Sequence, residues 1–153
     1  MSERPIHVPH ARARMHMTQA LLESVRRTMP ELKVTDEVTI RFGGGFQPTV
    51  DIVIWAPEGD AAALDGPVPG ALVKLVVEVS DATIGDDLGD KLAAYARAGV
   101  PEYWVVDVKA RVIFRHSEPA DGHYRGRKAV SFGEPVASFT LTGVIADTAA
   151  LAR

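Results

Sequence analysis

The chain has 153 residues, a net charge of −3, 46% hydrophobic residues and no cysteine. This length favours a single domain with a sizeable core, and the lack of cysteine excludes disulfides and thiolate metal sites. No apolar run approaches the roughly 20 residues of a membrane span, and the N-terminus has no apolar signal-peptide core, so we expect a cytoplasmic protein without membrane contact. Because the chain is acidic overall, binding to nucleic acid would need local basic patches or a bound metal.

The chain is predicted to consist of an irregular N-terminal segment, residues 1–14, and one domain, residues 15–153. Prolines and mixed polar residues mark the first segment. The domain is predicted to open with a helix over residues 15–28, because apolar residues recur there at helical spacing before Pro30 ends the pattern.

A β-hairpin is predicted next. Residues 34–42 alternate between apolar and polar side chains, as in a half-buried strand. The three glycines at 43–45 suit a flexible turn, and residues 51–55 form the predicted return strand. Proline and glycine then predict a loop over residues 57–70.

The second half of the chain predicts a buried strand, a helix and further strands. Residues 72–79 are nearly all apolar, as in a strand covered on both faces. Residues 84–98 carry an apolar stripe at helical spacing that ends before a glycine, and residues 118–122 predict a turn. Three later strands and a tail with a short strand and a helical turn are predicted at residues 103–107, 112–116, 124–130 and 139–151. This order predicts an α/β fold in which a central mixed β-sheet is flanked by helices.

Two acids stand at the ends of predicted buried strands. Asp51 opens the apolar run over residues 51–55, and Glu78 nearly ends the run over residues 72–79. Either acid alone would also suit a solvent-exposed strand end. Burial of a lone carboxylate is costly unless it is paired or bound to a metal, so the two together indicate a divalent-metal site for phosphodiester chemistry.

Asp87 and Lys91 lie four residues apart in the helix that follows the Glu78 strand. From the spacing alone, the plainer interpretation is a solvated helix pair that contributes about 0.3 kcal/mol. The alternative is that the helix aims Lys91 into the same cleft as Glu78, because the helix starts directly after that strand.

Other titratable residues carry weaker signals. His7, His10 and His16 lie in the segment predicted to be irregular, and we interpret them as surface residues rather than a metal cluster. His116 and His123 flank a turn and are expected to be exposed. Basic residues of the late strands fit either a solvated face or a phosphate-contacting face: Arg111, Arg115, Arg125, Arg127 and Lys128.

The run from Leu75 to Asp107 resembles the Uma-type restriction endonucleases of the PD-(D/E)XK nuclease superfamily. The matching pieces within this run are Glu78-Val79-Ser80, Asp87, Lys91, Tyr95, Gly99-Val100, Glu102-Tyr103-Trp104 and Asp107. The upstream strand Val50–Ile54 matches the family's motif with its aspartate at Asp51. The resemblance covers roughly residues 15 to 150.

This resemblance implies a restriction-endonuclease-like fold and metal-dependent hydrolysis of phosphodiester bonds in nucleic acid, with DNA as the expected partner. It implies catalytic roles for Asp51, Glu78 and Lys91. Asp51, Glu78 and the backbone carbonyl of Val79 would hold Mg²⁺ or Mn²⁺. Supporting roles are implied for Glu23, Ser80, Asp87 and Tyr95.

Two features depart from the superfamily pattern. Pro48 is displaced by two residues from its usual place directly before the motif aspartate, Asp51. Ser80 stands two residues after Glu78, where the superfamily's lysine lies. In this family a helix lysine is thought to replace it, and Lys91 is the matching position.

Two rival interpretations stay open from the sequence. One is a catalytically silent relative that acts as a dimeric nucleic-acid or protein interaction module, because a fold does not determine a function. The other is a structural domain in which Asp87 and Lys91 only pair on the surface. A homodimer is expected because relatives are often dimers and because the strand around Trp104 suits a buried sheet or an interface.

Overall fold

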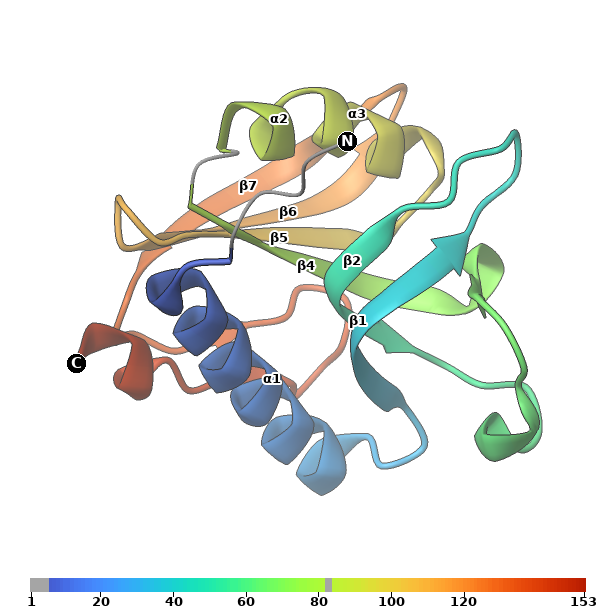
Figure 1. Ribbon diagram of the computed structural model, residues 1–153, viewed down its shortest axis with the longest axis horizontal. Helices are drawn as coiled ribbons and strands as arrows, with labels where there is room; N and C mark the ends of the chain where they lie inside the picture. Colours follow the sequence, from blue (N-terminus) through green and yellow to red (C-terminus); the bar gives the residue numbers. More distant parts are fainter. Residues whose placement is uncertain (1–5, 82–83) are drawn as a thin grey trace.

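Alternating and continuous apolar segments form one mixed sheet between two helical layers (Figure 1). The computed structural model describes residues 6–81 and 84–153. Its elements, in chain order, are α1 (Val8–Thr28), β1 (Lys33–Arg41), β2 (Thr49–Trp55), η1 (Ala61–Ala63), β3 (Val68–Pro69), η2 (Gly70–Leu72), β4 (Val73–Ser80), α2 (Ile84–Leu88), α3 (Asp90–Arg97), β5 (Glu102–Asp107), β6 (Val112–Ala120), β7 (His123–Ser131), β8 (Val136–Ala137), β9 (Ile145–Ala146) and η3 (Ala149–Ala152).

Seven strands of the described residues form the main sheet, in the order β3-β1-β2-β4-β5-β6-β7. β4 pairs parallel with β5, whereas β2 pairs antiparallel with β4 and β6 with β5. Parallel neighbours need a crossover connection, and α2 and α3 lie in the one between β4 and β5. The predicted central mixed sheet flanked by helices is confirmed.

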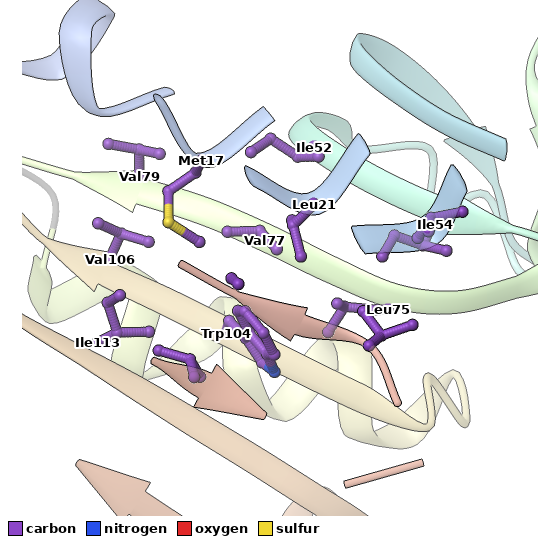
Figure 2. Close-up of a cluster of buried hydrophobic side chains, with 14 of the residues drawn as sticks. Met17, Leu21, Ile52, Ile54, Leu75, Val77, Val79, Trp104, Val106 and Ile113 are labelled. Carbon is purple, nitrogen blue, oxygen red and sulfur yellow. The ribbon is translucent and has the colours of Figure 1, made fainter. Parts of the chain in front are cut away.

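One face of the sheet packs against α1 and the C-terminal segment. Figure 2 shows Met17 and Leu21 of α1 against the apolar side chains of β2, β4 and β5. Val77 and Trp104 are fully buried in this layer. The helix is therefore held by its apolar stripe, as an amphipathic helix on a sheet should be.

The other face packs against α2 and α3 and is rich in aromatic residues. The ring of Tyr95 in α3 lies 4.9 Å, centroid to centroid, from that of Tyr103 in β5. Phe42 and Phe46, at the two ends of the turn between β1 and β2, also contact Tyr95. The glycine-rich turn thus ends over α3, which places the β1–β2 hairpin beside the helix that carries Lys91.

The prediction of an irregular segment over residues 1–14 is wrong for residues 8–14, because α1 begins at Val8. Pro9 lies in the first helical turn, where its missing N–H has no intrahelical acceptor to lose. Ala13 is buried against the sheet and extends the apolar stripe of Met17 and Leu21 towards the N-terminus. Residues 1–5 lie outside the described part of the chain.

The single helix predicted over residues 84–98 is two helices. Gly89 interrupts it with a backbone conformation of φ −111° and ψ −104°, between α2 and α3. A β-carbon at Gly89 would lie 2.7 Å from the carbonyl oxygen of Gly85, so the break depends on glycine.

The turn predicted at 118–122 is shorter, because Asp121 and Gly122 alone, both with positive φ, connect β6 to β7.

The strand around Trp104 is buried inside one chain. β5 lies between β4 and β6, and Trp104 is fully covered by the layer of α1. The burial of this strand therefore gives no support to the expected homodimer, and the dimer and the cytoplasmic location stay predictions. Within residues 6–81 and 84–153, no helix is long and apolar enough to cross a membrane.

Candidate functional site

Asp51 and Glu78 interlock at the point where β2 begins and β4 ends. The β2–β4 register sets Ile52 opposite Val77, which places the two acids side by side. The Asp51 N–H donates to Glu78 Oε1 at 2.9 Å, and the Val79 N–H donates to Asp51 Oδ2 at 2.7 Å. Because strand side chains alternate, both acids project to the face of the sheet that α3 covers.

The two carboxylates are poorly solvated. The side chain of Glu78 is 4% exposed and that of Asp51 is 20% exposed. Burial raises the pKa of Glu78 to about 7, opposed by the charge of Lys91 and reinforced by that of Asp51. Burial also raises the pKa of Asp51, although the Val79 hydrogen bond and the nearby cations oppose this. Burial therefore disfavours the charged form of both carboxylates.

Lys91 reaches this pair from the first turn of α3. Its Nζ lies 3.2 Å from Glu78 Oε2 and 3.0 Å from Asp87 Oδ1. Burial lowers the pKa of Lys91, but the carboxylates of Glu78 and Asp87 outweigh burial, and the pKa is raised. The Lys91 side chain is 45% exposed, but Asp87 is only 1% exposed and Lys91 also contacts Glu78, so this is not a solvated surface pair of Asp87 and Lys91 alone.

Tyr95 and Ser80 lie around Glu78. The Tyr95 hydroxyl is 3.5 Å from Glu78 Oε2, and burial keeps the pKa of this phenol above its ordinary value. Ser80 is fully buried at the end of β4, where its carbonyl accepts the Val108 N–H at 2.9 Å. The residues predicted around Glu78 are thus brought together, because β4 and α3 are adjacent in sequence and in space.

His10, interpreted from the sequence as a surface residue, lies in the site. Its Nε2 is 3.7 Å from Asp51 Oδ1, and its Nδ1 is buried without a hydrogen-bond partner among the described residues. Arg14, one turn further along α1, pairs with Glu37 and lowers the pKa of Asp51 by its charge. The N-terminal turns of α1 therefore form one wall of the site.

Glu23 does not join this group. It is exposed on α1, 13 residues after His10, which corresponds to about 20 Å along the helix. Its neighbours are other surface residues of the same helix, Gln19, Arg26 and Arg27. The structure therefore does not bring Glu23 to the acid pair, because α1 approaches Asp51 with its opposite end.

The expected exposure of His116 is wrong, because its Nδ1 is held 3.0 Å from the Tyr103 carbonyl and the side chain is buried.

The donor set fits a hard divalent cation. Asp51 and Glu78 offer carboxylate oxygens, the ligands that Mg²⁺ and Mn²⁺ prefer. Burial raises their pKa values by disfavouring the charged carboxylates, and a bound cation would favour that charged form. No group of three or more His, Asp or Glu side chains in the described part of the chain is arranged to hold a metal. A cation here would therefore need backbone, water or phosphate oxygens in addition to the two acids.

The stability of the metal-free protein should fall as pH rises through the titration of Glu78. Its folded pKa of about 7 exceeds the ordinary value of 4.5, so the folded state binds more protons than the unfolded state between these values. The free energy of unfolding should decrease by about 3 kcal/mol from pH 4.5 to pH 8 through this group. Urea unfolding in EDTA measures it, and Glu78→Gln should flatten the profile. An unchanged profile in this variant would contradict the assignment.

Comparisons with known proteins identify a matching family and a similar fold. The sequence model of the Uma2 family, described as "Putative restriction endonuclease", matches residues 2–149. A crystal structure of a "putative nuclease belonging to DUF820" from Anabaena variabilis is similar, with a TM-score of 0.73 and 10% sequence identity over 98% of this chain and 83% of that chain. At this identity the likeness concerns the fold alone. No curated protein gives a significant match.

Proposed function

The chain belongs to the Uma2 restriction endonuclease family, and from this premise we propose that it is a divalent-metal-dependent endonuclease that hydrolyses DNA phosphodiester bonds. One observation carries the proposal: a buried and a half-buried carboxylate from neighbouring strands lie side by side, and a lysine ammonium lies 3.2 Å from the buried one. Such a group of perturbed acids beside a fixed cation is typical of catalytic sites.

Asp51 and Glu78 are the proposed metal ligands. The Val79 carbonyl is the proposed third ligand. In an extended strand the N–H and C=O of one residue face the same neighbouring strand, and the Val79 N–H faces Asp51. When bound, Mg²⁺ or Mn²⁺ would lower the pKa of a water molecule and neutralise charge on the scissile phosphate. Asp51 is held in place for this role by the Val79 N–H, and Glu78 by the Asp51 N–H.

Lys91 is the proposed positioning and charge-stabilising group. Its raised pKa keeps the ammonium protonated, so it can orient a water molecule or donate to a phosphate oxygen whose charge grows in the transition state. Asp87 also pairs with the ammonium, at 3.0 Å. Tyr95 stays a neutral phenol that steadies Glu78 Oε2.

Plasmid DNA cleavage with Mg²⁺ or Mn²⁺, abolished by EDTA, tests the proposal. Calorimetric titration with Mn²⁺ provides a second measurement that does not depend on turnover. Cleavage without added metal and in EDTA would contradict the proposed chemistry. Binding of Mn²⁺ without cleavage of any nucleic acid would favour the silent interaction module.

Lys91→Ala should slow cleavage by on the order of 10²-fold, because one fixed charge at the developing oxyanion is lost. Mn²⁺ affinity should not fall, since the variant keeps both acids and removes a competing cation. Cleavage rates and Mn²⁺ calorimetry together measure this. Lys109→Ala, at an exposed turn between β5 and β6, is the matched control and should cleave normally. Full activity in Lys91→Ala would remove this lysine from the mechanism.

A further inference from the structure

A second cleft, apart from the acid pair, carries uncompensated positive charge. It has a volume of about 700 Å³ and lies between the end of β1, the start of β4 and the end of α3. Arg41, Lys74 and Arg97 line it, one from each of these elements, and no acidic residue of the described chain does. Arg41 and Arg97 are exposed, and Lys74 is half-buried.

The cleft gathers positive charge on a chain whose net charge is −3. Among the described residues, ion pairs join Arg14 to Glu37 and Lys91 to Glu78. Within residues 6–81 and 84–153, no ion pair engages Arg41, Lys74 or Arg97. Arg97 lies in the last turn of α3, where a cation also offsets the helix dipole. Arg41 and Lys74 have no such explanation.

The cleft shares two elements with the candidate site, because Glu78 lies on β4 and Lys91 on α3. Lys74 precedes Glu78 by four residues on β4, which corresponds to about 13 Å along the strand. Arg97 follows Lys91 by six residues on α3, which corresponds to about 9 Å along the helix. Because β4 is buried between Lys74 and Glu78, a DNA backbone would follow the outer surface of α3 from the cleft to the acids, over a few nucleotides.

We propose that the cleft of Arg41, Lys74 and Arg97 binds the phosphate backbone of the DNA whose scissile bond lies at Asp51 and Glu78. This inference rests on the proposed nuclease function and adds a binding surface to it. The three cations come from three separate elements around a cleft of about 700 Å³, which suits a polyanion better than a single phosphate. Backbone contacts of this kind set affinity and register without reading sequence.

The test is equilibrium binding of a fluorescent DNA duplex in EDTA, where cleavage cannot interfere. The variant Arg41→Gln/Lys74→Gln/Arg97→Gln should bind on the order of 10²-fold more weakly at low salt. Its plot of log affinity against log salt should be less steep by about 2 to 3, since each phosphate contact contributes about 0.9. The matched control, Arg26→Gln/Arg27→Gln/Lys33→Gln, removes three charges from exposed positions at the far end of α1 and the start of β1. It should retain most of the affinity.

The outcomes separate the cleft from the nuclease proposal. Thermal melting first shows that both variants are folded. Equal losses in the two variants, or none in the cleft variant, overturn the cleft as a DNA site even if the wild type cleaves DNA. A selective loss in the cleft variant supports it even if the wild type never cleaves. Mn²⁺ affinity and Mn²⁺-dependent hydrolysis of bis(4-nitrophenyl) phosphate should be unchanged in the cleft variant, because this small diester does not extend to the cleft.

Discussion

Asp51→Asn and Glu78→Gln are each expected to lower metal-dependent DNA cleavage by on the order of 10³-fold or more and to abolish Mn²⁺ binding in calorimetric titration. Each change removes a charged oxygen donor of the proposed metal site and keeps the shape of the side chain. The Asp51 N–H donates to Glu78 and the Val79 N–H donates to Asp51, so the two carboxylates are fixed beside each other.

The fold should survive both substitutions. An amide oxygen can still accept the N–H that Asp51 or Glu78 accepts now, at 2.7 and 2.9 Å. Glu78→Gln should even stabilise the metal-free protein above pH 7, because a buried carboxylate is replaced by a neutral group. Asp86→Asn and Glu31→Gln, at exposed positions, are the isosteric controls.

The pattern across these variants decides between the interpretations. Full cleavage in both site variants would mean that any nuclease activity comes from a contaminant. If the wild type binds Mn²⁺ but does not cleave DNA, and both variants lose Mn²⁺ binding, the silent interaction module is favoured. Unchanged Mn²⁺ binding in both variants would place the metal elsewhere.

The strands could be predicted because their hydrophobic patterns are strong and local. The run over residues 72–79 indicated a strand covered on both faces, and β4 is buried along nearly its whole length. The proximity of Asp51 and Glu78 followed from their places at strand ends. The interlocking of these acids did not, since it depends on the register between β2 and β4, which no local pattern determines.

His10 was missed because Pro9 was taken as a mark of irregular structure. Proline is compatible with the first turn of a helix, where its N–H is not needed. A usable signal was present in the sequence, since Ala13, Met17 and Leu21 recur every four residues and continue the apolar stripe into the segment before residue 15. Extending the helix by this stripe would have placed His10 on the element that packs over β4.

Glu78 and Glu102 look alike in the sequence, because each is an acid in an apolar strand. The cost of burying a carboxylate predicted that such an acid must have partners. The partners differ: Glu78 faces a lysine and a second acid, whereas Glu102 is surrounded by neutral donors from a segment more than 30 residues away. Sequence spacing could not distinguish a charged site from a structural clamp, since the contacts of Glu102 are long-range.

Glu102→Ala is expected to destabilise the protein by about 4 kcal/mol or more. Glu102 is fully buried and accepts hydrogen bonds from the Trp104 indole at 2.7 Å and the Ser138 hydroxyl at 2.7 Å. The Phe139 N–H and both the N–H and hydroxyl of Thr140 also donate to it. Truncation leaves these donors without an acceptor, at a cost of about 1–3 kcal/mol for each one that stays buried.

Urea unfolding of Glu102→Ala and Glu102→Gln measures this clamp. The Gln variant should lose less stability, because its amide oxygen can still accept some of these hydrogen bonds while its NH₂ group faces other donors. Glu58→Ala, at an exposed position, should change stability by less than about 0.5 kcal/mol. Because Glu102 joins β5 to residues 138–140, amide exchange in the C-terminal segment should rise more than exchange at Asp51 and Glu78. Equal exchange throughout the chain would mean that Glu102 stabilises the whole domain rather than anchoring this segment.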